Sequence, residues 1–334
     1  MKLIEHFDAF LKDVVNLNQS RIDLLETRVD AVRDFLRASD FRPRIYRFSA
    51  QGSRAVKTII KPPNGKDFDA DELVITETVE GWAAQDYIND LLRVFKVSDR
   101  YKSLAKKGTR CVTLDYANDF HLDIVICIRC KDSGRVWFVV CNSKTNEFEL
   151  TDGEGFAEWF DGRNTLTGGT LLRKTTRLVK YQRDIKQTFS AKSVLLATLL
   201  GTMVYDWDDQ QRGTYFSDVP TALKTIVGRL DDWLRTRPLM PIVTNPALPS
   251  ENFTRHWDQD KYANFCDKTH QYRDWIDDAF AETDRSASIA KWQKVFGDQF
   301  ARGEAASKSA SFAQIQVLRS AAIASPPLRP WSSE

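Results

Sequence analysis

The sequence has little of what marks membrane, secreted and polymer-binding proteins. No apolar run approaches the length of a bilayer span, and Glu5 places an acid too early for a secretory signal. Five cysteines, an odd number, do not suit a disulfide framework in a chain of 334 residues. The net charge of +2 gives little overall attraction to nucleic acid. We therefore expect a cytoplasmic protein without membrane or nucleic-acid partners, and a small anionic substrate.

One cysteine spacing is typical of zinc sites. Cys127 and Cys130 form a CxxC, but residues 122–129 read as a β-strand, in which positions i and i+3 face opposite sides. The two thiols are therefore not expected to share a metal ion.

The composition, 42% hydrophobic and 28% charged, suits a soluble chain with a full core and two lobes. Apolar residues at helical spacing predict two consecutive helices, or one bent helix, over residues 3–36. Strand patterns follow at 44–48, 68–75, 111–116, 120–129 and 136–141. A further helix is predicted at 82–97. These elements predict an α+β domain over residues 1–170.

The second half of the chain reads as mainly helical. Helices are predicted at 171–186, 193–205, 222–235 and 275–300. The segment 303–311 is rich in Ala, Ser and Lys, and 325–331 is rich in proline, which indicates a linker, a last helix and an extended end. We expect a helical lobe with a proline-rich tail over residues 171–334.

The most informative segment joins a glycine turn to closely spaced acids. Gln51-Gly52-Ser53 suits a phosphate-gripping turn, because Gly52 allows close backbone approach and Ser53 offers a hydroxyl and a helix N-terminal amide. Asp69 and Asp71 then lie two apart in a strand, so their side chains share a face and can hold a pair of Mg²⁺ ions. Asp67 shares that face, but Asp71 lies nearer the apolar run, which favours Asp69 and Asp71. A solvated acidic turn is the alternative.

A third carboxylate has to come from a neighbouring strand. Asp123 is an isolated acid at the start of an apolar strand, where a charge is costly without a role or partner. It is our third predicted metal ligand and catalytic residue; a strand-end acid paired with His121, or solvated, is the alternative. Three carboxylates with two Mg²⁺ ions would neutralise a triphosphate and activate an attacking hydroxyl.

Two helices of the second half carry candidate phosphate ligands. In residues 177–183 the Leu and Val would pack inward, while Lys180 and Arg183 could face the triphosphate; a solvated basic face is the alternative. Ser193 begins an apolar helix, where it would either cap the helix or contact a phosphate.

Together these motifs resemble the bacterial CD-NTases, the cGAS/DncV-like nucleotidyltransferases related to oligoadenylate synthase. The resemblance rests on Gly52-Ser53, Asp69-Ala70-Asp71, Asp123 after His121-Leu122, and the segments 177–180 and 193–201. It covers residues 40–205 by motif and the helical remainder by layout. One departure is Asp67, where the family often has glutamate.

The resemblance implies a polymerase-β-like core, a mixed sheet with long N-terminal helices, and an active site in the cleft between this core and a C-terminal helical lobe. It implies synthesis of a cyclic di- or trinucleotide second messenger from nucleoside triphosphates such as ATP or GTP, in the anti-phage systems called CBASS. Asp69, Asp71 and Asp123 would bind two Mg²⁺ ions, for which Mn²⁺ can substitute. Gln51, Gly52, Ser53, Lys180 and Ser193 would bind the nucleotide. A messenger-activated effector and a HORMA-type or conjugation-type regulator are the implied partners.

Two other functions fit some of the same residues. A nucleotidyltransferase that modifies transfer RNA or a small molecule uses the same chemistry, although the balanced charge argues against a transfer-RNA acceptor. The second alternative is a catalytically silent nucleotide-binding scaffold. Such a protein has no need to keep three carboxylates together, where their mutual repulsion is unfavourable. The bases, the ring size and the linkage are not specified by any motif.

Overall fold

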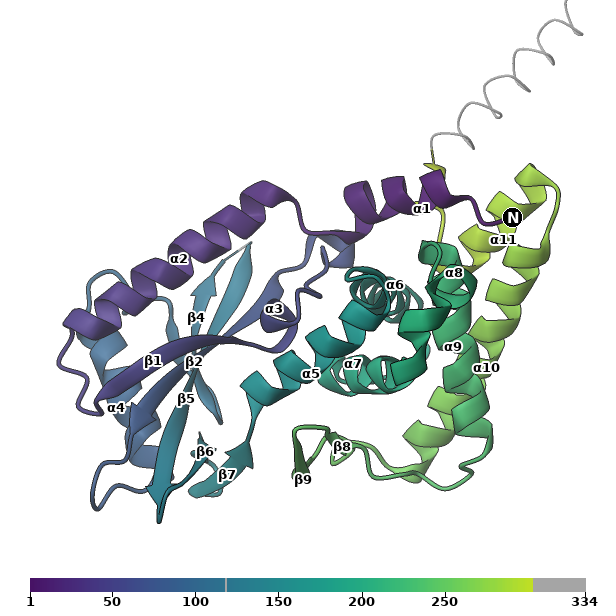
Figure 1. Cartoon of the computed structure of the whole chain (residues 1–334). Helices are drawn as coiled ribbons and strands as arrows, with labels where there is room; N and C mark the ends of the chain where they lie inside the picture. Colours follow the sequence, from purple (N-terminus) through teal and green to yellow (C-terminus); the bar gives the residue numbers. More distant parts are fainter. Residues whose placement is uncertain (118, 303–334) are drawn as a thin grey trace, which may run out of the picture.

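We describe the protein from a computed structural model, which covers residues 1–117 and 119–302. A mixed sheet with two long helices lies beside a larger group of helices, and the chain passes between them near its start and again after the last strand of the sheet (Figure 1). The segments 303–311 and 325–331, for which a linker and an extended end are predicted, lie outside the described residues.

Two helices open the chain, as predicted. Helix α1 (Ile4–Phe10) continues into a π-helical turn (Leu11–Val15), and α2 (Gln19–Ala38) starts after Asn18, whose side chain accepts a hydrogen bond from the Arg21 backbone. The bend between them separates two packing environments. Helix α1 packs with the helical lobe, whereas α2 covers the sheet (Figure 1).

The sheet has seven strands, of which β2 and β5 form its parallel centre. The order is β1-β2-β5-β4-β3, and the second half of the long strand β5 pairs with β6, which pairs with β7. The bounds are Ile45–Gln51 (β1), Phe68–Glu77 (β2), Ala105–Lys107 (β3), Cys111–Tyr116 (β4), Phe120–Asp132 (β5), Arg135–Asn142 (β6) and Glu147–Thr151 (β7). All five predicted strands are present, and β3 and β7 were not predicted.

The two faces of the sheet are covered differently. Alternate residues of β2 and β5 pack on one face against α2 and α4 (Ala84–Val97) in a large apolar cluster. The other face carries a small cluster that includes Leu73, Ile75 and Cys127. Cys127 belongs to this second cluster and Cys130 packs against the first, so the two thiols lie on opposite faces, as predicted. The polar starts of β2 and β5 therefore open toward the helical lobe.

The lobe consists of α1 and the helices that follow β7. These are α5 (Gly153–Leu166), α6 (Leu171–Lys186), α7 (Ser193–Thr202), α8 (Arg212–Tyr215), α9 (Val219–Arg235), α10 (Gln259–Ala281) and α11 (Arg285–Phe296). Short 3-10 turns lie at Pro63–Gly65 and Asp206–Gln211, α3 is a single turn at Gly52–Ala55, and a hairpin of β8 (Thr244–Asn245) and β9 (Leu248–Asn252) extends toward β7. Helix α5 packs into the apolar cluster of the lobe. The domain boundary at residue 170 stays a prediction.

The prediction of one helix over 275–300 is wrong. Helix α10 starts at residue 259, after Asp258 caps it through the Lys261 backbone, and it ends before Glu282. Asp284 then accepts a hydrogen bond from the Ala287 backbone at 2.7 Å and starts α11. Within the described residues, every helix is too short or too polar to cross a lipid bilayer.

Candidate active site

The parallel pairing of β2 with β5 brings predicted site residues together. Asp71 lies opposite Asp123, and Asp69 lies opposite His121. Since alternate residues of a strand share a face, Asp69, Asp71 and Asp123 point to the same side, on which the small apolar cluster continues the strands. The three carboxylates therefore gather at the face that opens toward the lobe.

The glycine turn lies directly against Asp71. Strand β1 ends at Gln51, opposite Asp71, and Gly52 follows with a φ of 59°. A Cβ atom on Gly52 would come within 2.5 Å of Asp71 Oδ2, so both the backbone angle and the space require glycine. Ser53 faces the cleft. Gln51 instead places its amide beside Gly153, away from the lining of the two cavities described below.

Burial and mutual repulsion disfavour the charged form of Asp71. Desolvation, then the negative charges of Asp123 and Asp69, raise the pKa of Asp71 to about 7. Asp123 accepts a hydrogen bond from Thr113 Oγ1 at 2.5 Å, on the neighbouring strand β4. The alternative that Asp123 pairs with His121 is therefore wrong. Thr113 is a site residue that the sequence analysis missed.

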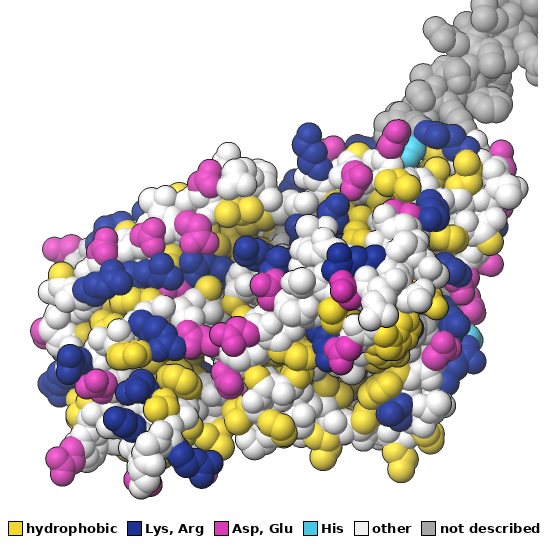
Figure 2. Space-filling model, viewed as in Figure 1, with side chains coloured by type: hydrophobic (Ala, Val, Ile, Leu, Met, Phe, Trp, Pro, Cys, Tyr) yellow, Lys and Arg dark blue, Asp and Glu magenta, His cyan; other side chains and the backbone are white. Residues whose placement is uncertain are grey.

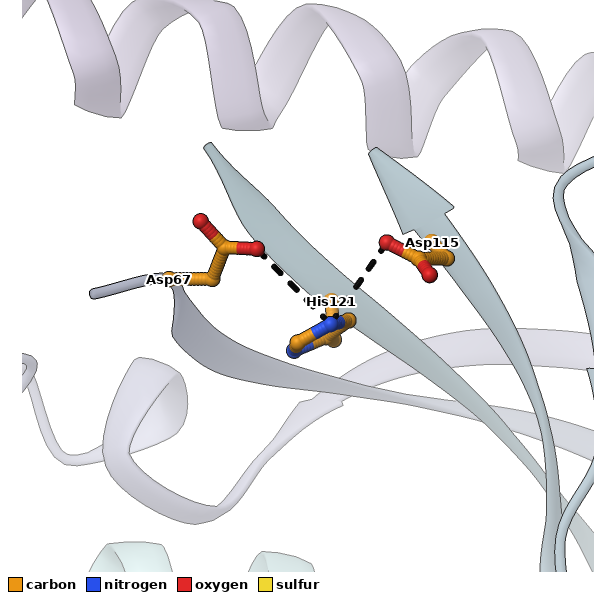
Figure 3. A group of neighbouring side chains, drawn as sticks. All are labelled: Asp67, Asp115 and His121. Carbon is orange, nitrogen blue, oxygen red and sulfur yellow. Dashed lines mark ion pairs between the residues drawn. The ribbon is translucent and has the colours of Figure 1, made fainter. Parts of the chain in front are cut away.

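His121 lies among three carboxylates, of which only Asp69 also belongs to the group of three acids described above. Its Nε2 is 3.5 Å from Asp115 Oδ1 and 3.8 Å from Asp67 Oδ2, and its Nδ1 is 3.3 Å from Asp69 Oδ1. Figure 3 shows Asp67 and Asp115 on either side of the imidazole ring. Asp67, Asp115 and His121 could hold a metal ion, although Lys106 already pairs with Asp115.

Lys180 on α6 is a buried lysine. Its side chain is only 4% exposed and donates to the Thr58 carbonyl at 2.8 Å. Desolvation, and then the nearby charge of Arg183, lower the pKa of Lys180 to about 8. Leu178 and Val179 are buried, as predicted. The alternative of a solvated basic face is therefore wrong for Lys180, which lines the cleft together with Arg183.

Ser193 does not cap α7. The N-cap residue is Lys192, and no side chain makes a capping hydrogen bond there. Ser193 Oγ instead accepts a hydrogen bond from Arg183 at 3.3 Å and faces the cleft. The capping prediction is therefore wrong, because Ser193 is the first residue of the helix, whereas a capping residue would directly precede it.

Two adjoining cavities, of about 890 Å³ and about 410 Å³, form the cleft between sheet and lobe. Lys180 and Arg183 line the larger cavity, and Asp71 and Asp123 line the smaller one. Five residues line both: Ser53, Asp69, Lys192, Ser193 and His256. The described residues thus provide a continuous space that runs from three carboxylates to a cationic helix.

A buried ion network behind the site was not predicted. Glu72 is 1% exposed and lies on the opposite face of β2 from Asp71. Its two oxygens accept hydrogen bonds of 2.6 Å from Arg54, next to Ser53, and from Arg33 on α2. Arg54 also pairs with Glu26. The sequence did contain a signal for this network. Because side chains alternate along a strand, Glu72 has to face away from Asp69 and Asp71, where a buried acid needs a cationic partner.

The fold and cleft define a nucleotidyltransferase: a Gly-Ser turn and gathered carboxylates on a mixed sheet, with a helical lobe across the cavity. Residues 1–164 match the SMODS family, the Second Messenger Oligonucleotide or Dinucleotide Synthetase domain. The chain belongs to this family of bacterial CD-NTases, and it has the polymerase-β-like fold expected from the resemblance.

Named relatives agree with this assignment. A c-di-GMP synthase of Roseivirga ehrenbergii is 23% identical over 296 residues, which are 80% of this chain and 74% of that protein. The structure of Escherichia coli MS115-1 CdnC with ATP matches at a TM-score of 0.70 and 20% identity, over 89% of this chain and 98% of CdnC. A second CdnC structure is of its complex with HORMA-deltaN, with 21% identity, a TM-score of 0.69 and the same coverage.

Bradyrhizobium diazoefficiens CdnG in complex with GTP matches at a TM-score of 0.71 and 19% identity, over 91% of this chain and 97% of CdnG. These structures share the fold. With the family assignment, they identify the chain as a nucleotidyltransferase of the kind that makes cyclic oligonucleotide second messengers.

Proposed function

We propose that this chain joins nucleoside triphosphates into a cyclic di- or trinucleotide at Asp69, Asp71 and Asp123, which hold two Mg²⁺ ions. The observation that carries the proposal is the gathering of these carboxylates beside Gly52 and Ser53 in one cavity. Metal-assisted transfer to a hydroxyl needs this combination of clustered acids and an open phosphate-binding turn.

The residues present fit a divalent cation. Within the described part of the chain, no Lys or Arg forms an ion pair with Asp69, Asp71 or Asp123, and the pKa of Asp71 is raised by burial and by the other two acids. A cluster of carboxylates without cationic partners is stabilised by a bound cation. When bound, Mg²⁺ supplies charge neutralisation for the triphosphate and lowers the pKa of the attacking hydroxyl.

The surrounding residues divide the remaining work. Ser53, Lys180 and Ser193 would bind the donor triphosphate across the larger cavity, where Lys180 is held by Thr58. Asp123, oriented by Thr113, would lie nearest the attacking hydroxyl. The lobe covers the cleft and limits access of water, which would otherwise hydrolyse the donor. Gln51 stays a predicted nucleotide ligand that must turn from Gly153 to reach the cavity.

We place the reaction in cytoplasmic anti-phage signalling of the CBASS type, with a messenger-activated effector downstream. ATP and GTP are the first substrates to test, since CdnC and CdnG have been solved with them. A HORMA-type regulator is supported by likeness to CdnC, which is solved in complex with HORMA-deltaN. A conjugation apparatus is the other predicted regulator. Two alternative functions have to be tested against this proposal. They are the modification of transfer RNA or of a small molecule, and a role as a catalytically silent scaffold.

The test is to incubate purified protein with Mg²⁺ or Mn²⁺ and four labelled nucleoside triphosphates, treat with phosphatase, and analyse by chromatography and mass spectrometry. A phosphatase-resistant product that disappears in the Asp69→Asn/Asp71→Asn variant supports the proposal, and its mass gives the ring size and bases. A product that survives this double substitution contradicts the assigned site. If wild-type protein with its regulator added makes only linear or acceptor-linked products, cyclic synthesis is wrong.

A further inference from the structure

Besides the three acids, the lining of the smaller cavity carries three cationic or basic side chains. Lys192 precedes α7, and Arg255 and His256 follow strand β9. Within residues 1–117 and 119–302, neither Lys192 nor Arg255 forms an ion pair with a carboxylate. Arg255 Nε donates to His256 Nε2 at 3.3 Å. Cations that line a cavity without forming ion pairs are suited to an anionic ligand.

Glu149, a carboxylate that is influenced by the charge of Arg255, already has a cationic partner. Glu149 receives two hydrogen bonds from Arg110, at 2.7 and 2.8 Å, and Arg255 adds only a through-space effect that helps lower the pKa of Glu149. The pKa of His256 is lowered by burial, and then by the positive charges of Arg255, Lys192 and Arg110. The three cations therefore act together on His256, although Glu149 lies within the electrostatic reach of Arg255.

The cationic side chains are distributed unevenly over the two cavities. Phosphodiester synthesis brings two nucleotides together, and each carries a negatively charged triphosphate. Lys180 and Arg183 line only the larger cavity, whereas Arg255 lines only the smaller one, beside Asp123. Lys192 and His256 line both. Since Asp123 is the residue assigned to the attacking hydroxyl, Arg255 lies on the acceptor side.

We infer that Arg255, with His256 and Lys192, binds the 5′-triphosphate of the acceptor nucleotide; this inference rests on the proposed function. In the transfer step the acceptor hydroxyl oxygen bonds to the donor α-phosphorus. The bond from that phosphorus to pyrophosphate breaks, and the hydroxyl proton is released. The acceptor triphosphate takes no part in these bond changes, so its contacts contribute to KM for the acceptor more than to kcat.

The test uses a labelled 2′,3′-dideoxynucleoside triphosphate, which has no attacking hydroxyl and serves only as donor. The acceptor is either a nucleoside triphosphate or the same nucleoside without phosphate. Arg255→Gln is expected to raise KM for the triphosphate acceptor at least about tenfold, since charge-assisted hydrogen bonds are lost. KM for the nucleoside acceptor should not change. Arg135→Gln removes an exposed arginine on β6, outside both cavities, and is the matched control.

An equal loss with both acceptors would mean that Arg255 holds the donor or the departing pyrophosphate, and would overturn the inference. An unchanged KM for both acceptors would also overturn it. Calorimetric binding of inorganic tripolyphosphate in EDTA tests the wall without catalysis: Arg255→Gln should weaken binding, and Arg135→Gln should not. If wild-type protein forms no product with any acceptor, the proposed function fails, while the binding result still decides whether Arg255 holds oligophosphates.

Discussion

Asp71 and Glu72 are neighbours on β2, yet their surroundings are opposite. Glu72, on the back face, is held by Arg33 and Arg54, so its charge is compensated inside the protein. Asp71, on the cleft face, has no such partner among the residues that the structure describes, and its pKa is raised to about 7 by burial and by the other two acids. A carboxylate with a structural role is neutralised by the fold, whereas one that awaits a ligand is left uncompensated.

The largest effect should come from the uncompensated acid. Asp71→Asn is expected to lower the rate of product formation about a thousandfold or more, which corresponds to about 4 kcal/mol of lost transition-state stabilisation. The free energy of unfolding of metal-free protein should not fall, because the change removes repulsion with Asp69 and Asp123. Rate assays and urea denaturation in EDTA measure the two quantities. A large loss of stability would contradict the comparison.

The back-face acid should show the reverse pattern. Glu72→Gln is expected to reduce the free energy of unfolding by about 3 kcal/mol, because it removes the negative charge shared by Arg33 and Arg54. Glu77→Gln is the matched control on the same strand, since the Glu77–Arg44 pair is exposed and 3.7 Å long, and should cost less than about 0.5 kcal/mol. If the two substitutions lower the free energy of unfolding equally in denaturant titrations, the ion pairs of Glu72 with Arg33 and Arg54 are not important for stability.

Lys180 extends the comparison to a buried cation. Its folded-state pKa, about 8, lies below the ordinary 10.5, so the unfolded chain binds more protons and stability rises as pH increases from 8 toward 10.5. Lys180→Met removes the buried charge and should raise the free energy of unfolding at pH 7 by about 2 kcal/mol, after the lost bond to Thr58 is counted.

This advantage of Lys180→Met should shrink by pH 10, where wild-type Lys180 is largely neutral when folded. Chemical denaturation at the two pH values measures it, and nucleotide transfer should fall at the same time. A variant that is less stable at pH 7 would show that the hydrogen bond to Thr58 outweighs the burial of the charge.

The smallest effect is expected at Thr113. Thr113→Val keeps the shape but removes the donor to Asp123, and should lower the transfer rate about fivefold to tenfold, with a weaker apparent affinity for Mg²⁺. Thr113→Ser keeps the hydroxyl and should restore most of the rate. If Ser and Val behave alike, packing rather than the hydrogen bond is the role of Thr113.

Local sequence patterns predicted the residues whose position follows from the two-residue period of a strand. The two-residue spacing of Asp69 and Asp71, and the isolated Asp123, predicted acids that the parallel register of β2 and β5 brings to one face. Thr113 was missed because a threonine in a strand is ordinary, and only the pairing of β4 with β5 places it beside Asp123.

Features that depend on loops and helix caps could not be predicted from the sequence. Arg255 and His256 follow the short hairpin of β8 and β9, whose few residues carry no periodic signal, and their position depends on how that hairpin meets the sheet. The break between α10 and α11 was missed because the cap at Asp284 interrupts a helical pattern that apolar spacing alone carries through.

Helix α1 gives the order of assembly an unusual constraint. Phe7 packs edge-on against Trp292 and Phe300, with ring centroids 4.8 and 5.1 Å apart, across nearly the whole described chain. During synthesis, the strands within residues 19–151 can pair early, whereas the first helix meets Trp292 and Phe300 only after most of the chain has been made. A nascent or truncated chain without Trp292 and Phe300 therefore leaves α1 without these packing partners, and we expect such a chain to hold the sheet and the lobe together less firmly.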